Sequence, residues 1–127
     1  MSRFLLDTDV LIDVSRDREP ALSLEMVLSA DKAEIGICPV QLAEFYAGQD
    51  PGDRPAWDAF VNSLICWKIT AAVGQCAVEY RRAFARHGQA IGTPDALNAA
   101  VAWTMGAAMV TGTGKDYPMA GVEVIVP

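Results

Sequence analysis

Close to its N-terminus the chain reads Phe4-Leu5-Leu6-Asp7-Thr8-Asp9-Val10-Leu11-Ile12-Asp13. The first three of these residues predict a short buried strand that ends at Asp7. The apolar positions Leu11, Ile12 and Val14 then predict a short helix over residues 8–15. A strand that gives way at once to a helix is typical of folds in which strands and helices alternate.

The same alternation continues along the chain. Further helices are predicted over residues 20–28, 39–48, 55–64, 71–86 and 93–106, and further strands over residues 34–38, 66–69, 108–111 and 122–126. Pro39 suits the first position of a helix, and Gly48 and Gly106 suit helix ends. Strands separated by helices predict a three-layer α/β/α sandwich with a central, mostly parallel sheet. We expect residues 1–127 to form this sandwich as a single domain.

Composition excludes several classes of protein. The 127 residues are 52% hydrophobic, which is enough for a core and excludes a disordered chain. The longest apolar stretch, residues 96–110, is too short to span a membrane, and the N-terminus has no signal-peptide pattern. Three widely spaced cysteines indicate neither a disulfide framework nor a zinc site. We therefore expect a cytoplasmic protein without a membrane partner.

The charge balance is acidic. Ten Lys and Arg residues against sixteen Asp and Glu residues give a formal net charge of −6. A protein that held nucleic acid by phosphate neutralisation alone would be basic, so a nucleic-acid partner requires local cancellation of the negative charge, for example by bound divalent cations. One basic cluster consists of Arg81, Arg82, Arg86 and His87. This cluster either grips an acidic partner or is the solvated face of a helix.

Three acids, Asp7, Asp95 and Asp116, fall where an α/β fold gathers its ligands, beyond strand ends or in the first turn of a helix. Glu44 lies in the middle of the predicted helix 39–48, among apolar neighbours. Converging carboxylates repel by about 4 kcal/mol per close pair at an effective dielectric near 20, so an ionised cluster needs a cation. Oxygen ligands without a nearby His or Cys favour Mg²⁺ or Mn²⁺. One or two such ions can activate a water for displacement at phosphorus.

Each acid also has a purely structural interpretation. Asp7 suits a helix N-cap, and Asp95 suits the first turn of a helix. Glu44 suits a solvated helix position, and Asp116 suits a turn. The hypothesis of a metal site therefore depends on the combination of the four acids and on none of them singly.

Four segments, in order, resemble the motifs of the PIN-domain family, and more narrowly those of the VapC-type toxins of bacterial toxin–antitoxin pairs. The first is residues 4–13, and the others read Val40-Gln41-Leu42-Ala43-Glu44-Phe45-Tyr46-Ala47-Gly48, Pro94-Asp95-Ala96-Leu97-Asn98-Ala99-Ala100-Val101-Ala102 and Val110-Thr111-Gly112-Thr113-Gly114-Lys115-Asp116-Tyr117. In the last segment the family commonly shows Thr-x-Asn or Asp, followed by Asp-Phe. Thr113 departs from this pattern, so the fourth acid is Asp116 or is missing. Asp9 stands where Ser or Asn is common.

The resemblance implies a metal-dependent endoribonuclease that hydrolyses RNA phosphodiester bonds with a metal-activated water. It also implies a homodimer and a cognate antitoxin protein. By position, Asp7 and Asp95 would be direct ligands of Mg²⁺ or Mn²⁺, and Asp116 would complete the metal site. Glu44 would hold or help activate the water, so that all four acids are candidate catalytic residues. Nearby polar side chains that could orient water or support the site are Thr8, Asn98, Thr111 and Thr113.

Three alternatives belong to other classes. A PIN-like fold that has lost catalysis would act only as a binding module, and Thr113 leaves this open. A haloacid-dehalogenase-type phosphatase would use Asp7 as its nucleophile, but the chain lacks the later acidic pair of that family. A receiver domain would need an acceptor Asp after its third strand, and residues 66–70 contain none. Binding of Mg²⁺ or Mn²⁺ through Asp7 and Asp95 separates the nuclease from the binding module.

Overall fold

The structure is a computed structural model that describes residues 2–127. Its strands are β1 (Arg3–Leu6), β2 (Glu34–Ile37), β3 (Ile65–Cys66), β4 (Ala107–Val110) and β5 (Val124–Ile125). Its α-helices are α1 (Thr8–Ser15), α2 (Ala21–Ala30), α3 (Pro39–Ala47), α4 (Arg54–Asn62), α5 (Ala71–Ala85) and α6 (Thr93–Met105). Two 3-10 turns are η1 (Pro51–Asp53) and η2 (Gly114–Asp116). Across residues 2–127, no helix combines the length and the apolar character needed to cross a bilayer.

The five strands form one parallel sheet in the order β3-β2-β1-β4-β5. The central strand is β1, in which Phe4 pairs with Ile35 of β2 and with Ala108 of β4. Parallel neighbours require crossover connections, which here contain the helices. The carboxyl ends of all strands therefore lie at one edge of the sheet, where Leu6 pairs with Val110.

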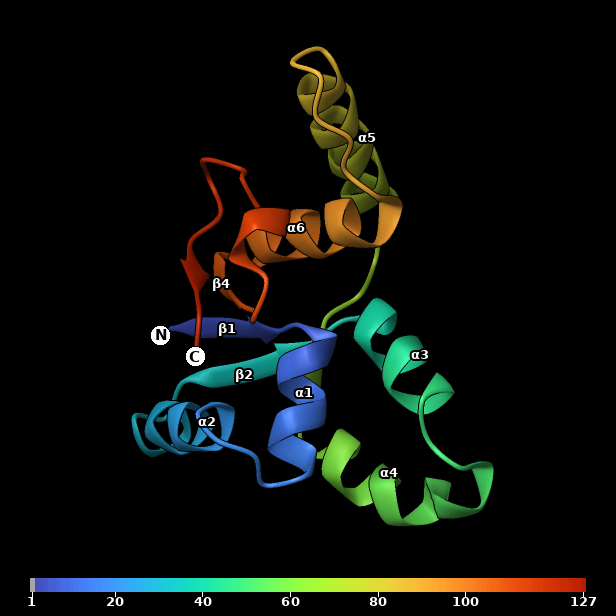
Figure 1. The fold of residues 1–127 in the computed structure, drawn as a ribbon, viewed down its shortest axis with the longest axis vertical. Helices are drawn as coiled ribbons and strands as arrows, with labels where there is room; N and C mark the ends of the chain where they lie inside the picture. The colour runs from blue at the N-terminus through green and yellow to red at the C-terminus, as the bar shows by residue number, and fades with distance from the viewer. Residues whose placement is uncertain (1) are drawn as a thin grey trace.

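The sheet separates two hydrophobic cores. Successive residues of a strand point to opposite faces. Leu5 accordingly packs in a core with residues of α5 and α6, whereas Leu6 packs in a core with residues of α1, α2, α3 and α4. Figure 1 shows α5 and α6 on one side of β1 and β2, and α1, α2 and α4 on the other. The predicted three-layer α/β/α sandwich is confirmed.

The observed strands and α-helices agree with the predicted ones in type and order, but the two edge strands are shorter than predicted. The strand predicted over residues 66–69 is Ile65–Cys66, and the strand predicted over residues 122–126 is Val124–Ile125. Both lie at edges of the sheet, where each pairs with only one neighbour. An apolar run in the sequence does not mark the residue at which such pairing stops.

Gly36 of β2 leaves no room for a side chain. A Cβ at this position would lie 2.6 Å from Cζ3 of Trp67 and 2.9 Å from the carbonyl oxygen of Ile65. Because Trp67 is itself buried, its ring has little space to move away. We expect Gly36→Ala to lower the free energy of unfolding by about 1–3 kcal/mol, measured by urea denaturation.

Gly74 of α5 provides the matched control for this substitution. Apart from its chain neighbours and the backbone of its own helix, a Cβ at Gly74 would meet no atom within 4 Å. Since alanine is the better helix former, Gly74→Ala should raise the free energy of unfolding by about 0.5–1 kcal/mol. Shifts of the same sign in the two variants would contradict the packing argument.

A candidate active site at the carboxyl edge of the sheet

Asp7 follows β1 and caps α1. Its Oδ1 accepts the N–H of Thr8 at 2.8 Å, and its extended backbone is the conformation of a helix N-cap. Its Oδ2 accepts the hydroxyl of Thr111 at 2.9 Å and the hydroxyl of Tyr117 at 3.1 Å. The N–H of Asp7 donates to the carbonyl of Val110 at 2.8 Å. Asp7 therefore acts as an N-cap and also joins the residues that follow β4.

Asp95 lies in the first turn of α6 and is half-buried. Its Oδ1 accepts the hydroxyl of Tyr117 at 3.2 Å, so a single hydroxyl lies against both Asp7 and Asp95. Burial raises the pKa of Asp95, and the charges of Asp116, Asp7 and Glu44 raise it further, against the lowering effect of the Tyr117 hydroxyl. The metal-free fold thus disfavours the charged form of Asp95.

Glu44 and Asp116 approach this pair in different ways. Glu44 is exposed on α3, and its Oε1 accepts the hydroxyl of Thr8 at 2.9 Å. Asp116 lies in η2, and its charge raises the pKa of Asp95. The structure therefore brings all four predicted acids to one edge of the sheet, with Asp7 and Asp95 most closely joined.

The loop after β4 is tied to the start of α1. Oγ1 of Thr111 accepts the N–H of Thr113 at 3.1 Å and lies 3.1 Å from the hydroxyl of Thr113. Oδ2 of Asp9 accepts the N–H of Gly112 at 2.9 Å. Burial, and next the charge of Asp7, raise the pKa of Asp9. Thr113 thus reaches Asp7 through Thr111, and Asp9 lies at the rim of the site.

A chain of buried amides lies behind the carboxylates. The N–H of Cys38 donates to Oε1 of Gln41 at 2.9 Å, and Nε2 of Gln41 donates to Oδ1 of Asn98 at 2.6 Å. Nδ2 of Asn98 in turn donates to the hydroxyl oxygen of Tyr117 at 3.0 Å. The sequence singled out Asn98, but neither Gln41 nor Tyr117. A signal for Tyr117 was present, because it follows Asp116 where the similar family commonly has Phe.

The donor set fits a hard cation that keeps much of its water. Within residues 2–127, no three Asp, Glu, His or Cys side chains are placed so that together they could hold a metal ion. In the same range, none of the four acids belongs to an ion pair with a basic side chain. Mg²⁺ is usually bound through one or two carboxylates, with water and substrate phosphate as further ligands. Asp7 and Asp95 are such a pair, and a cation would relieve the repulsion that, after burial, helps to raise the pKa of Asp95.

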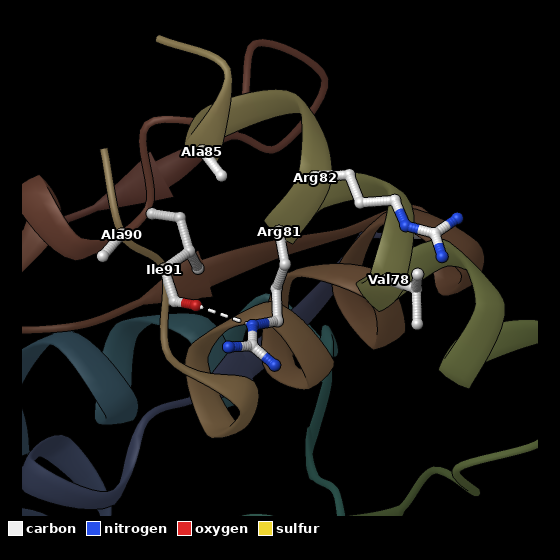
Figure 2. A pocket seen from close by; sticks show the side chains of 6 residues that line it. All are labelled: Val78, Arg81, Arg82, Ala85, Ala90 and Ile91. Atoms are coloured by element: carbon white, nitrogen blue, oxygen red, sulfur yellow. Dashed lines mark hydrogen bonds between the residues drawn. The ribbon is translucent and has the colours of Figure 1, made fainter. Parts of the chain in front are cut away.

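In the predicted basic cluster, Arg81 and Arg82 lie in the C-terminal half of α5, and Arg86 and His87 follow the helix. A cavity of about 370 Å³ lies there, lined by Val78, Arg81, Arg82, Ala85, Ala90 and Ile91. Figure 2 shows these six side chains. Nε of Arg81 donates to the carbonyl of Ile91, and its guanidinium also donates to the hydroxyl of Thr93, both at 3.0 Å. Arg82 forms an exposed ion pair with Glu79 at 3.7 Å. These contacts support the structural interpretation, in which Arg81 ties α5 to the start of α6.

The cysteines differ in their accessibility. Cys38 is buried, and Cys66 is exposed. Burial raises the pKa of both thiols, and that of the fully buried Cys38 rises to about 11. Because the thiolate is the reactive form, we expect iodoacetamide at neutral pH to modify Cys66 of the native protein and to leave Cys38 unmodified until urea is added. Mass spectrometry of the labelled peptides measures this, and equal native labelling of both thiols would contradict it.

Known proteins share this architecture. A family model described as the PIN domain matches residues 4–118. A chain of the crystal structure of VapBC2 from Rickettsia felis bound to a DNA fragment from its promoter is similar, with a TM-score of 0.84 and 20% identity over 98% of each chain. DNA-bound VapBC from Salmonella typhimurium has a TM-score of 0.81 and 18% identity over 99% of this chain and 98% of that chain.

A third similar structure is FitAcB from Neisseria gonorrhoeae, with a TM-score of 0.81 and 18% identity over 96% of each chain. At such identities the likeness is one of fold. No curated protein sequence matches the chain. The family model, in contrast, covers most of the sequence and includes all four candidate acids. The chain belongs to the PIN domain family.

Proposed function

We propose that the chain is a metal-dependent endoribonuclease and the toxin of a VapBC-type toxin–antitoxin pair. The main observation behind the proposal is that Asp7 and Asp95 both accept the hydroxyl of Tyr117. Within residues 2–127, neither carboxylate forms an ion pair with a basic side chain. Membership of the PIN domain family and the likeness in fold to VapBC structures support it.

We assign the four acids different roles in phosphodiester hydrolysis. When bound, Mg²⁺ or Mn²⁺ would lower the pKa of a water molecule and neutralise charge on the phosphoryl oxygens. Asp7 and Asp95 would hold the ion through carboxylate oxygens. Asp116 would complete the site through bound water, because no three such side chains within residues 2–127 are placed to hold an ion together. Glu44 has one oxygen occupied by the hydroxyl of Thr8, which leaves Oε2 to accept a proton from the attacking water.

Cleavage of a mixed set of structured RNAs tests this proposal. The purified chain is incubated with the RNAs in Mn²⁺ and, separately, in EDTA, and Mn²⁺ binding is measured by calorimetry. We expect cleavage in Mn²⁺ and none in EDTA. A chain that neither cleaves RNA nor binds Mn²⁺ would contradict the proposal and leave a binding module.

The phosphatase alternative is disfavoured by the surroundings of Asp7. A carboxylate offers about four lone-pair directions. The carboxylate of Asp7 already accepts three hydrogens, from Thr8, Thr111 and Tyr117. Roughly one lone-pair direction of Asp7 is left, and both of its oxygens are already held by hydrogen bonds, an arrangement that suits a ligand of a cation better than a nucleophile.

As partners we propose an antitoxin protein and a second copy of this chain, in the cytoplasm. Exposed apolar side chains offer contact surfaces, since Met26 of α2 is 60% exposed and Trp103 of α6 is 58% exposed. Light scattering on the purified chain tests the homodimer, with an expected mass twice that of the 13.6 kDa chain. A monomer at all concentrations would contradict it.

A further inference from the structure

We propose that Tyr117 is a positioning residue, whose hydroxyl holds the carboxylates of Asp7 and Asp95 together so that they bind a divalent cation as a pair. This inference rests on the proposed function, because it concerns the same two carboxylates. It adds a residue without a charge to the site, and it assigns a role to the buried amides behind it.

The direction of the buried hydrogen bonds is fixed from one end. A backbone N–H can only donate, so the N–H of Cys38 turns the oxygen of Gln41 toward itself and the NH₂ group of Gln41 toward Asn98. Oδ1 of Asn98 accepts this group and also faces the thiol of Cys38 at 3.5 Å. Asn98 must therefore present its NH₂ group to Tyr117. Each amide is thus limited to one orientation.

The orientation of the Asn98 amide determines where the hydroxyl hydrogen of Tyr117 points. Its oxygen accepts from Asn98, so its hydrogen points away from the amide chain and toward the carboxylates. The hydroxyl oxygen lies 3.1 Å from Oδ2 of Asp7 and 3.2 Å from Oδ1 of Asp95, so one hydrogen serves both acids almost equally. The ring is 3% exposed and packs in the core with α5 and α6, which makes the hydroxyl a rigid donor.

This arrangement leaves acceptor capacity for a cation. Asp7 accepts three hydrogens, which leaves it roughly one lone-pair direction. Within residues 2–127, Asp95 accepts only the hydrogen of Tyr117, which leaves it roughly three. Without the hydroxyl, the two like charges would move apart, and a cation would have to bring them together again. Loss of the hydroxyl should therefore weaken metal binding.

The test is Tyr117→Phe, which keeps the ring and removes only the hydroxyl. We expect Mn²⁺ binding, measured by calorimetry, to weaken roughly tenfold or more while circular dichroism and Tm show a folded protein. The electron paramagnetic resonance spectrum of bound Mn²⁺ should also change, because it reports the symmetry of the ligands. Tyr46→Phe is the matched control, since its hydroxyl bonds the carboxylate of Asp58 outside the site. This control should bind Mn²⁺ like the wild type.

The outcomes separate the two proposals. If the wild type binds Mn²⁺ and a folded Tyr117→Phe variant binds it equally well or better, the positioning role is overturned. The proposed function is then left in place. A wild-type chain that binds no Mn²⁺ overturns both.

A measurement on the wild type applies if Tyr117→Phe does not fold. The buried hydroxyl hydrogen of Tyr117 should give a slowly exchanging proton resonance, and saturating Mg²⁺ should shift it because both of its acceptors become ligands. A resonance that saturating Mg²⁺ leaves unchanged overturns the positioning role.

Discussion

Asp95→Asn is expected to abolish RNA cleavage and, at the same time, to make the metal-free protein more stable. Asparagine has nearly the same shape as aspartate, and its side-chain oxygen can still accept the hydroxyl of Tyr117. The charge that binds the cation is lost. Removal of a residue that only hydrogen-bonds to a metal ligand typically lowers metal affinity or activity about 10–100-fold. Loss of a ligand itself should therefore lower cleavage by more than about 100-fold.

The gain in stability follows from the raised pKa of Asp95. Burial and the neighbouring carboxylates disfavour its charged form in the folded chain. An acid whose folded pKa lies above its ordinary value of 3.8 favours folding while it is protonated, and that contribution is lost as the pH rises through the folded pKa. The asparagine side chain of the variant would remain neutral at every pH. The variant should therefore exceed the wild type in Tm at neutral pH in EDTA, and the difference should vanish in acid.

Asp31→Asn provides the matched control, because it removes the same charge from an exposed residue at the end of α2. It should cleave RNA like the wild type and show little change in Tm. Cleavage is measured in Mn²⁺, and Tm is measured by calorimetry in EDTA. An Asp95→Asn variant that cleaves normally, or that melts at a lower temperature than the wild type, would contradict the role assigned to Asp95.

Phe45→Ala is expected to have the largest effect on stability. Phe45 of α3 is 0% exposed, and its ring centroid lies 5.6 Å from that of Tyr46 and 5.7 Å from that of Trp57. Truncation would leave a cavity in the core between α3 and α4, which should lower the free energy of unfolding by about 3–5 kcal/mol. This is a large share of the roughly 5–15 kcal/mol typical of folded proteins.

Urea denaturation followed by circular dichroism measures this loss. Val27→Ala is the control, because Val27 is 58% exposed and its truncation should change the free energy of unfolding by no more than about 0.5 kcal/mol. Since Gln41 and Glu44 lie on the same helix as Phe45, the destabilised variant should also place these two side chains less well. A Phe45→Ala variant as stable as Val27→Ala would contradict the packing described for α3.

The parts of the fold that depend on local sequence were predictable. Residues 4–13 predict β1 and α1 because an apolar run and helical spacing are both local patterns. Gly106 marks the end of α6, where its φ of 63° is a conformation that glycine adopts without strain. The residue at which β3 ends does not depend on local sequence. Trp67 was predicted within that strand, but β3 ends at Cys66, and the ring of Trp67 lies over Gly36.

The candidate site likewise has a part that the sequence predicts and a part that it does not. Because strand order and parallel pairing place strand ends at one edge, the sequence could predict that Asp7, Asp95 and Asp116 would gather there. The buried amides could not be predicted, since Gln41 and Asn98 are 57 residues apart and polar side chains on helices usually face water. Only the folded chain brings them together. The catalytic roles of the acids stay predictions, and Asp95→Asn tests that of Asp95.

The position of β1 in the sheet determines when the site can exist during synthesis. One neighbour of β1 is β4, and Leu6 pairs with Val110 from the far end of the chain. The hydroxyl partners of Asp7 lie 104 and 110 residues after it. A ribosome releases the N-terminal part first, so a growing chain presents Asp7 before its partners have been made. A copy that has not yet been extended to Tyr117 therefore carries no assembled carboxylate pair, and the proposed nuclease should not cut RNA before that residue has been made.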